Sequence, residues 1–216
     1  MEKSLSKNPF KIYCFGFFYM YLIIVPVIVP YFMSLGLSMK EVFIIQAFFG
    51  FTVAIFEVPS AYLGDLWGRK NVLILGSLIT AIGFSFLLVA KDFYSLLFYE
   101  MLLGVGASFV SGAELSILYD SIGSKEKEKL RSISQLQMLF LVGESFAAVT
   151  CCLLMFYSYE YVIYGQVFIA WVPFVIALTV IEPPIERMSK DSHTENIKEV
   201  FRYIFIKHKL LRLIFI

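Results

Sequence analysis

Long apolar runs alternate with short polar segments over most of the chain. Six of these runs reach the length of about 20 residues that a helix needs to cross the hydrocarbon core of a bilayer. The runs lie at residues 10–33, 41–63, 71–90, 94–119, 134–157 and 161–181. The pattern therefore predicts an all-α membrane protein with a six-helix transmembrane bundle in residues 1–182.

The first run contains two prolines, Pro26 and Pro30. Proline has no backbone N–H group, and it bends a membrane helix where neighbouring groups can bind the freed carbonyls. We therefore expect the first run to form one kinked helix.

The composition explains why these runs do not form the core of a water-soluble domain. Hydrophobic residues make up 59% of the 216 residues and charged residues only 16%, whereas a soluble domain has roughly 25% charged residues. The bilayer must therefore be the solvent for much of the surface. The net charge of +1 also argues against a nucleic-acid binder, which presents a strongly basic surface.

Lysines and arginines are distributed unevenly between the two sides of the predicted bundle. Of the 18 in the sequence, only Lys40 and Lys91 fall in the turns of one side. The remainder lie in the turns and terminal segments of the other side. Because short loops rich in Lys and Arg stay in the cytoplasm, we predict that both termini are cytoplasmic.

The segment between the second and third runs, residues 57–71, is expected to be a tight turn with a distinctive charge pattern. It resembles the G-x-x-x-D-[R/K]-x-G-R-[R/K] loop between the second and third helices of the major facilitator superfamily of transporters. The matching positions are Asp65, Gly68, Arg69 and Lys70. At the first and third defined positions the chain has Ala61 and Leu66 instead.

The fourth run adds to this resemblance. Its end, S-G-A-E-L-S-I-L-Y-D-S at residues 111–121, looks like the S-G-x-[D/E]…Y-D-S end of the fourth helix in a bacterial branch of the superfamily. In such relatives the acid pairs with the loop arginine, which implies a cytoplasmic latch made of Asp65, Arg69 and Asp120. Glu100 stands where many members have an arginine, so the role of that cation does not carry over.

The resemblance implies the N-terminal half of a transporter. Residues 1–182 would hold two inverted three-helix repeats, residues 183–207 a cytoplasmic linker between halves, and residues 208–216 the start of a seventh span. The chain would then be truncated in or before its seventh helix. Its expected partners are the lipid bilayer and either a missing C-terminal half or a second copy, and its expected location is a bacterial plasma membrane.

Four glutamates interrupt the apolar runs: Glu57, Glu100, Glu114 and Glu144. A carboxylate in hydrocarbon costs about 2.5–3.5 kcal/mol on insertion scales, so such a residue faces a water-filled cavity, has a partner or is protonated. We interpret the four as candidate cavity or proton-coupling residues. Hydration near the headgroups and hydrogen bonding between helices are the alternatives.

The resemblance implies secondary active transport of a small solute by alternating access, powered by an ion or substrate gradient. The buried acids make proton coupling one candidate. Acids and aromatic residues in the runs favour export of an amphipathic compound, and a sugar or other polar solute is the alternative. Two further classes stay open: a non-transporting scaffold or assembly partner, and an inactive fragment of an interrupted transporter gene. The sequence contains no phosphate-binding glycine loop, zinc-ligand spacing or nucleophile elbow, so we expect no cofactor, metal site or enzymatic activity.

Overall fold

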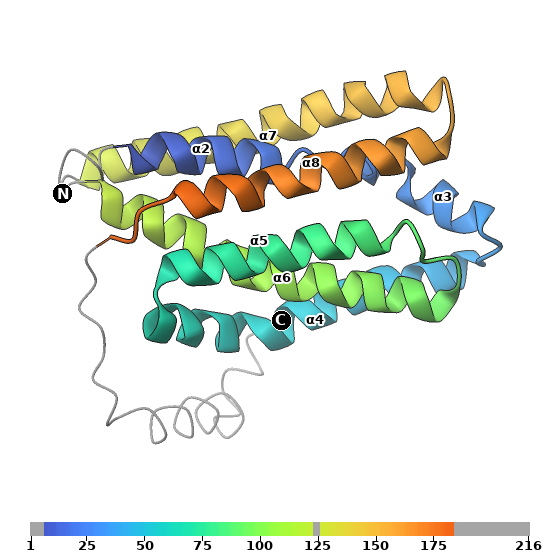
Figure 1. Ribbon diagram of the computed structural model, residues 1–216, viewed down its shortest axis with the longest axis horizontal. Helices are drawn as coiled ribbons and strands as arrows, with labels where there is room; N and C mark the ends of the chain where they lie inside the picture. The colour runs from blue at the N-terminus through green and yellow to red at the C-terminus, as the bar shows by residue number, and fades with distance from the viewer. Residues whose placement is uncertain (1–6, 123–125, 184–216) are drawn as a thin grey trace, which may run out of the picture. The chain divides into compact units, whose positions relative to one another are not determined.

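The computed structural model describes residues 7–122 and 126–183, and this part of the chain is helical and contains no β-strand (Figure 1). Its elements are α2 (Asn8–Tyr19), η1 (Val25–Val27), α3 (Ile28–Ser34), α4 (Met39–Trp67), α5 (Arg69–Phe86), α6 (Phe93–Ser121), α7 (Glu126–Met155) and α8 (Tyr159–Thr179). All of them belong to one compact unit, Met1–Pro184. The predicted all-α class is confirmed. The predicted linker beyond residue 183 and the predicted span at 208–216 lie outside the described residues.

Four of the described helices are long and apolar enough to cross a membrane, namely α4, α6, α7 and α8. α5 has 18 residues, but it begins with Arg69 and Lys70, which lower its mean hydropathy. The first apolar run is not a single helix. Helices of membrane-spanning length and composition are therefore present, and the count of six spans stays a prediction.

The first apolar run is broken, not merely kinked. An irregular segment and the short 3-10 turn η1 separate α2 from α3. Pro26 has no N–H group, and the bond before it is of 3-10 type, from the N–H of Val25 to the carbonyl oxygen of Leu22 at 3.3 Å. The side chain of Gln166 on α8 accepts the N–H of Ile24 at 3.2 Å. The prediction of one kinked helix was therefore wrong. The N–H of Ile24 binds the side chain of Gln166 instead of a carbonyl of its own helix, and this distant acceptor stabilises the break.

The connection between α4 and α5 is shorter than the sequence predicts. α4 continues through Pro59 to Trp67, so most of the predicted turn at residues 57–71 is helical. A single residue, Gly68, separates the helices, and its φ angle is +92°. Glycine adopts a positive φ without steric cost, so one residue is enough to start a new helix in a new direction.

α7 begins inside the charged segment at residues 125–131, which lies between the fourth and fifth apolar runs. Glutamate and lysine are good helix formers. Glu126 and Glu128 lie in the first turn of α7, where the helix dipole favours negative charge. The charged segment therefore extends the helix beyond its apolar part.

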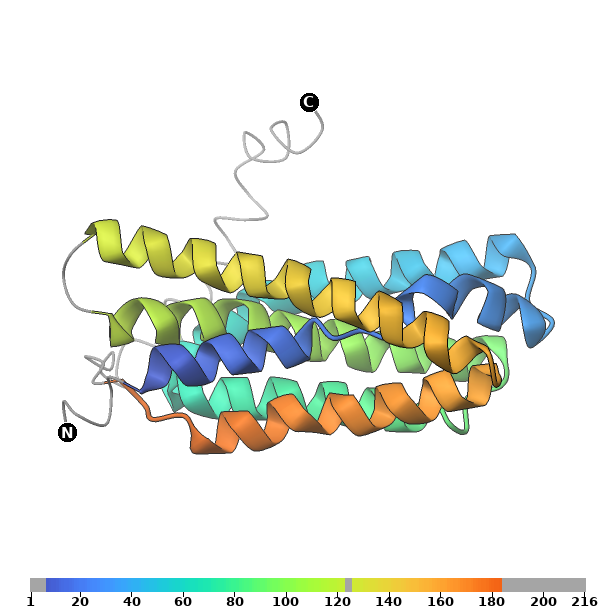
Figure 2. The ribbon, with the colours of Figure 1, turned by 90° about the horizontal axis from the view of Figure 1, so that it is seen from above.

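The helices do not pack in the order in which they follow each other in the chain. α6 packs against α4 and α5, whereas α2 packs against α7 and α8. α5 also packs against α8, and α2 contacts α6. Figure 2 shows α4 and α7 on one side of this unit, α5 and α8 on the other, and α2 and α6 between them. α2 and α6 are therefore the two inner helices.

Glycines allow the inner helices to approach their neighbours closely. A Cβ atom on Gly143 of α7 would lie 2.5 Å from the carbonyl oxygen of Phe17 on α2. A Cβ atom on Gly104 of α6 would lie 3.0 Å from the carbonyl oxygen of Phe49 on α4. Because a side chain at either position would collide with backbone, these glycines fix where the helices cross.

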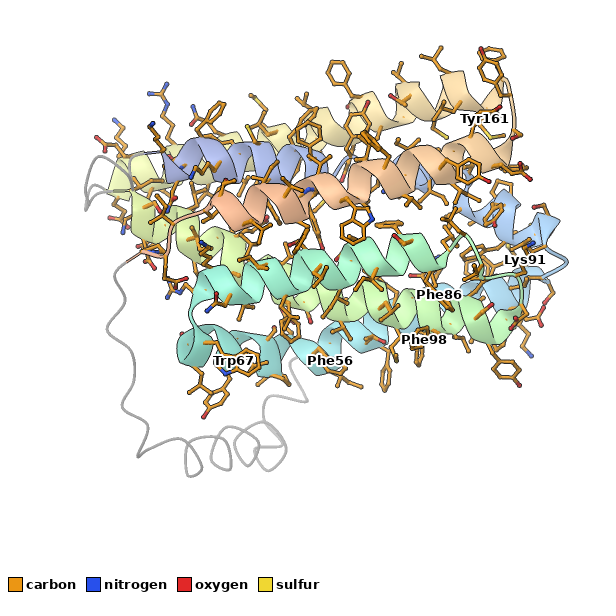
Figure 3. All side chains as sticks on the ribbon, in the orientation of Figure 1. Phe56, Trp67, Phe86, Lys91, Phe98 and Tyr161 are labelled. Carbon is orange, nitrogen blue, oxygen red and sulfur yellow. The ribbon has the colours of Figure 1, made fainter. Side chains whose placement is uncertain are left out.

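The two ends of the unit differ in charge. Trp67 and Lys91 lie near opposite ends (Figure 3). The end with Trp67 also contains the starts of α2 and α7 and the ends of α6 and α8 (Figure 1), and we call it the Gly68 end. Within the described ranges, Lys40 and Lys91 are the only lysines or arginines at the opposite end. The fold thus gathers the remaining described cations at the Gly68 end.

We predict that Gly143→Ala destabilises the protein by about 1–3 kcal/mol, the usual cost of overpacking. The new methyl group would meet the Phe17 carbonyl, a backbone atom that moves only if α2 shifts. Gly50→Ala on α4 is the matched control, because nothing lies within 4 Å of its Cβ position. Thermal unfolding of both purified variants in detergent measures the difference. An unchanged midpoint for Gly143→Ala would contradict the close approach of α2 and α7.

Candidate functional site

The Gly68 end is built around the N-terminus of α5. Gly68 precedes this helix and has no side chain with which to cap it. The backbone N–H groups of Arg69 and Lys70 donate instead to the two carboxylate oxygens of Glu182, each at 2.8 Å. A carboxylate here satisfies two free donors and complements the positive end of the helix dipole. The segment that follows α8 therefore caps α5.

The same contact restricts the residue at position 68. A Cβ atom on Gly68 would lie 2.9 Å from Oε1 of Glu182, which would push the carboxylate away from the donors of α5. The positive φ angle of Gly68 disfavours other residues as well. Glycine at this turn is thus required both by the backbone conformation and by the cap.

Arg69 forms an ion pair with Asp120 in the last turn of α6, and its Nη1 donates to the carbonyl oxygen of Ser116 at 3.4 Å. Asp65 is exposed and has no hydrogen bond or ion pair with any described residue. Asp65 and Arg69 nevertheless line the same hollow of about 140 Å³. The side chain of Lys70 also has no partner in the described ranges. Two members of the predicted latch are therefore in contact, and the third is open to another group.

Asn8 connects three segments at the same end. Its Nδ2 donates to Oγ of Ser121 at 3.0 Å and to the carbonyl oxygen of Ile181 at 2.7 Å, and its Oδ1 accepts the N–H of Ile181 at 3.1 Å. Because Asn8 is fully buried, these bonds replace the water that it cannot reach. Lys11 donates to the carbonyl oxygen of Thr179 at the end of α8. The start of α2 thus binds the ends of α6 and α8.

A cavity of about 280 Å³ lies between the break after α2 and the helices α4, α5 and α6. We call it the Glu100 cavity after the acid in its wall. Glu100 is only 4% exposed, and its Oε1 accepts a hydrogen bond from Nε2 of Gln46 at 2.8 Å. Its Oε2 has no hydrogen-bond partner in the described part of the chain and is open to the cavity. Glu100 is therefore buried in the bundle, away from the bulk water that hydration near the headgroups would supply.

Glu114 lies further along α6 and is also 4% exposed. Its Oε2 has no hydrogen-bond partner in the part of the chain that the structure describes. Glu114 neighbours Tyr19, which also lines the Glu100 cavity. A buried carboxyl without a partner is costly to keep charged, which makes Glu114 a candidate proton carrier.

The other two predicted acids have exposed side chains, Glu57 on α4 and Glu144 on α7. Neither lines the Glu100 cavity. Large apolar residues of the same two helices are exposed too, for example Phe51 and Phe146. Glu57 and Glu144 thus lie on faces of α4 and α7 that this unit leaves uncovered.

Sequence reasoning does not identify Asn8, Gln46 or Glu182. A signal exists for the two amides, since each lies in or beside an apolar run, and a buried amide needs hydrogen-bond partners. Glu182 has no local signal, because it binds the backbone of Arg69 across 113 positions of the sequence.

We predict that Glu182→Gln lowers the free energy of unfolding by about 1 kcal/mol, the usual value of a helix cap. A neutral amide offers only one acceptor and complements the helix dipole less well. Glu144→Gln, which changes an exposed and unpaired acid, should leave the stability unchanged. Thermal unfolding followed by circular dichroism compares the two. Equal midpoints would show that the cap on α5 does not contribute.

Comparison with known proteins gives two matches. The model of the Major Facilitator Superfamily matches residues 12–216. The chain is also 24% identical over 167 residues to a protein named as an uncharacterized transporter from Buchnera aphidicola subsp. Schizaphis graminum (strain Sg). That match covers 75% of this chain and 42% of the relative, so the chain spans less than half of the relative's length.

These matches agree with the apolar helices of spanning length, and together they indicate an integral membrane protein. The family model covers nearly all of the sequence. The chain therefore belongs to the Major Facilitator Superfamily, a superfamily of transporters.

Proposed function

We propose that this protein carries out secondary active transport of a small solute by alternating access. The observation that carries the proposal is the Gly68 end, where a capped and ion-paired turn leaves Asp65 beside a hollow and without a partner among the described residues. In this proposal the described helices form one of two bundles that rock against each other around a substrate site. The second bundle is a further part of the same polypeptide or a second copy of this chain.

The uncovered faces of α4 and α7 support a second bundle. Both helices expose large apolar side chains, and within their apolar runs each exposes one acid, Glu57 on α4 and Glu144 on α7. Lipid covers apolar side chains well, but an acid in hydrocarbon is costly and is normally found facing protein or a water-filled pathway. We therefore assign these two faces to contacts with the second bundle and to the pathway between bundles.

Asp65 is the proposed latch residue. Glu182 holds the backbone of the α4–α5 turn and Asp120 holds the side chain of Arg69, so Asp65 is presented on a firmly anchored turn. An exposed carboxylate there can bind the positive N-terminus of a helix in the second bundle. If the Gly68 end is cytoplasmic, as its lysines and arginines favour, this contact keeps the outward-facing state closed on the cytoplasmic side.

The acids and aromatic side chains of the bundle also favour export of an amphipathic compound with proton coupling. Glu114 is the proposed proton carrier, because its Oε2 is buried without a partner among the described residues and it neighbours Tyr19 at the Glu100 cavity. A proton on Glu114 removes the cost of a buried charge. Its loss to the opposite side of the membrane would then drive solute movement in the other direction.

We predict that Asp65→Asn lowers solute transport about tenfold, within the range of a typical coupling between sites. Transport is measured in membrane vesicles from cells that express the protein from its own gene, with a gene deletion as baseline. The matched control is Lys127→Gln, which changes an exposed cation at the same end that has no hydrogen bond or ion pair with any described residue. Unchanged transport in Asp65→Asn would reject the latch. Vesicles that move no solute above the baseline would favour a scaffold or an inactive fragment.

We predict that Glu114→Gln abolishes transport driven by a proton gradient and retains solute exchange without a gradient. The amide has nearly the same shape as the acid, but it cannot release a proton. Glu160→Gln, which alters an exposed acid at the start of α8, should keep both activities. Flux into vesicles with and without an imposed pH difference separates them. Gradient-driven transport by Glu114→Gln at the normal rate would exclude Glu114 as the proton carrier.

A further inference from the structure

The Glu100 cavity has an acidic group that no basic side chain among the described residues balances. In this part of the chain its wall contains one acid, Glu100, and no lysine, arginine or histidine. Gln46 fixes Oε1 of the carboxylate through its amide, which is a neutral donor and does not cancel the charge. Oε2 has no hydrogen-bond partner among the described residues and is open to the cavity. A positively charged group in the cavity would balance a charge on Glu100, and one that carries an N–H group would also hydrogen-bond to the free oxygen.

Most of the rest of the wall is apolar, and part of it is aromatic. Phe49 comes from α4, Phe84 from α5 and Tyr99 from α6. Phe84 and Tyr99 meet edge to face, with ring centroids 6.0 Å apart. Aromatic rings attract organic cations as well as apolar groups. This wall therefore suits a ligand that combines an apolar body with a positive charge.

The broken helix forms one side of the cavity. The irregular segment after α2 contributes Met20, Leu22 and Ile24 to the wall. Irregular backbone at membrane depth is tolerated where it is buried in protein or lines a cavity. The break is thus a structural feature that the cavity uses, in addition to the acid and the aromatic rings.

The volume of the Glu100 cavity and the oxygen atoms in its wall restrict the size and kind of cation that it can bind. A volume of about 280 Å³ is at the lower end of small-molecule sites, which are about 300–1,000 Å³. An inorganic cation such as Ca²⁺ needs about 6–8 oxygen ligands, and the wall supplies few oxygens beyond Glu100, Gln46 and hydroxyl groups. A small organic cation needs only one carboxylate and an apolar surround.

We infer that the Glu100 cavity binds a monovalent amphipathic cation of the amine or quaternary ammonium class. Its charged nitrogen lies against Oε2 of Glu100, and its apolar body lies among the aromatic and aliphatic side chains. This inference deepens the proposed function and rests on it for the identification of the bound cation as the transported solute. Organic anions are disfavoured, because they would meet Glu100 without any cation to balance them.

The test compares two ligands of the same shape on the unaltered protein. Benzyltrimethylammonium is the probe, and neopentylbenzene, its neutral carbon analogue, is the matched competitor. Binding of labelled probe to the purified protein in lipid nanodiscs is measured by equilibrium dialysis. We expect saturable binding of the cation and at least about tenfold weaker competition by the neutral analogue, which corresponds to about 1.4 kcal/mol. Equal binding of the two ligands would overturn the inference.

The second arm uses variants. We expect Glu100→Gln to weaken binding of the probe about tenfold or more, and Glu160→Gln to leave it unchanged, with circular dichroism confirming that both variants are folded. Binding of the cation to Glu100→Gln at normal affinity would overturn the inference. If Glu100→Gln does not fold, the comparison of the two ligands on the unaltered protein decides.

The binding test and the transport test can each give a negative result without the other, so failure of the cation site is distinguished from failure of the proposed function. Saturable cation binding without transport in vesicles would reject the proposed function and retain the cation site. Transport of a neutral or anionic solute by a protein that does not bind benzyltrimethylammonium would retain the proposed function and reject the cation site.

Discussion

The bilayer offers no water to polar groups inside it, and this constraint governs the structure. Every polar group in the bundle must find its partner in the protein. Asn8 binds the ends of two helices, Gln166 accepts an N–H freed by the break after α2, and Glu182 caps α5. The partners come from segments far apart in the chain. The polar contacts therefore determine how the helices are joined, while apolar packing holds them together.

The same constraint identifies the groups that stand out. Oε2 of Glu114 is buried without a partner among the described residues, and Oε2 of Glu100 is open to a cavity. In a membrane protein an incompletely paired acid is a functional candidate, because a structural role alone would favour an apolar residue. Both acids lie on α6, one of the two inner helices, and Tyr19 of the other inner helix is near both the cavity and Glu114.

The exchanged helix order has a simple interpretation. If residues 1–182 form two three-helix repeats, then the first helix of each repeat packs against the second and third helices of the other. Gly16 on α2 faces Leu136 and Phe140 on α7, and Gly104 on α6 faces Thr52 on α4. These are equivalent crossings in the two repeats. The inverted repeats stay a prediction, and such an exchange would bind the two repeats into one bundle.

The sequence predicts the helices well and their junctions poorly. A membrane span is specified by local composition, and the pairing of Arg69 with Asp120 was implied by a family resemblance. The break after α2 depends on Gln166 as a distant acceptor, and the one-residue turn at Gly68 depends on Glu182. Neither Gln166 nor Glu182 lies near the break or the turn in the sequence, so local sequence patterns cannot predict these contacts. The Glu100 cavity likewise exists only when residues of α2, η1, α3, α4, α5 and α6 have come together.

The long-range contacts at the Gly68 end also bear on biosynthesis. Asn8 binds Ile181 across 173 positions, and Arg69 binds Glu182 across 113. The N-terminal helices are synthesised first, so α2 and α5 lack these partners while α6, α7 and α8 are still being made. The contacts of Ile181 with α2 and of Glu182 with α5 form last. A nascent chain released before residue 182 would have an open end, with buried polar groups that quality-control proteases and chaperones can detect.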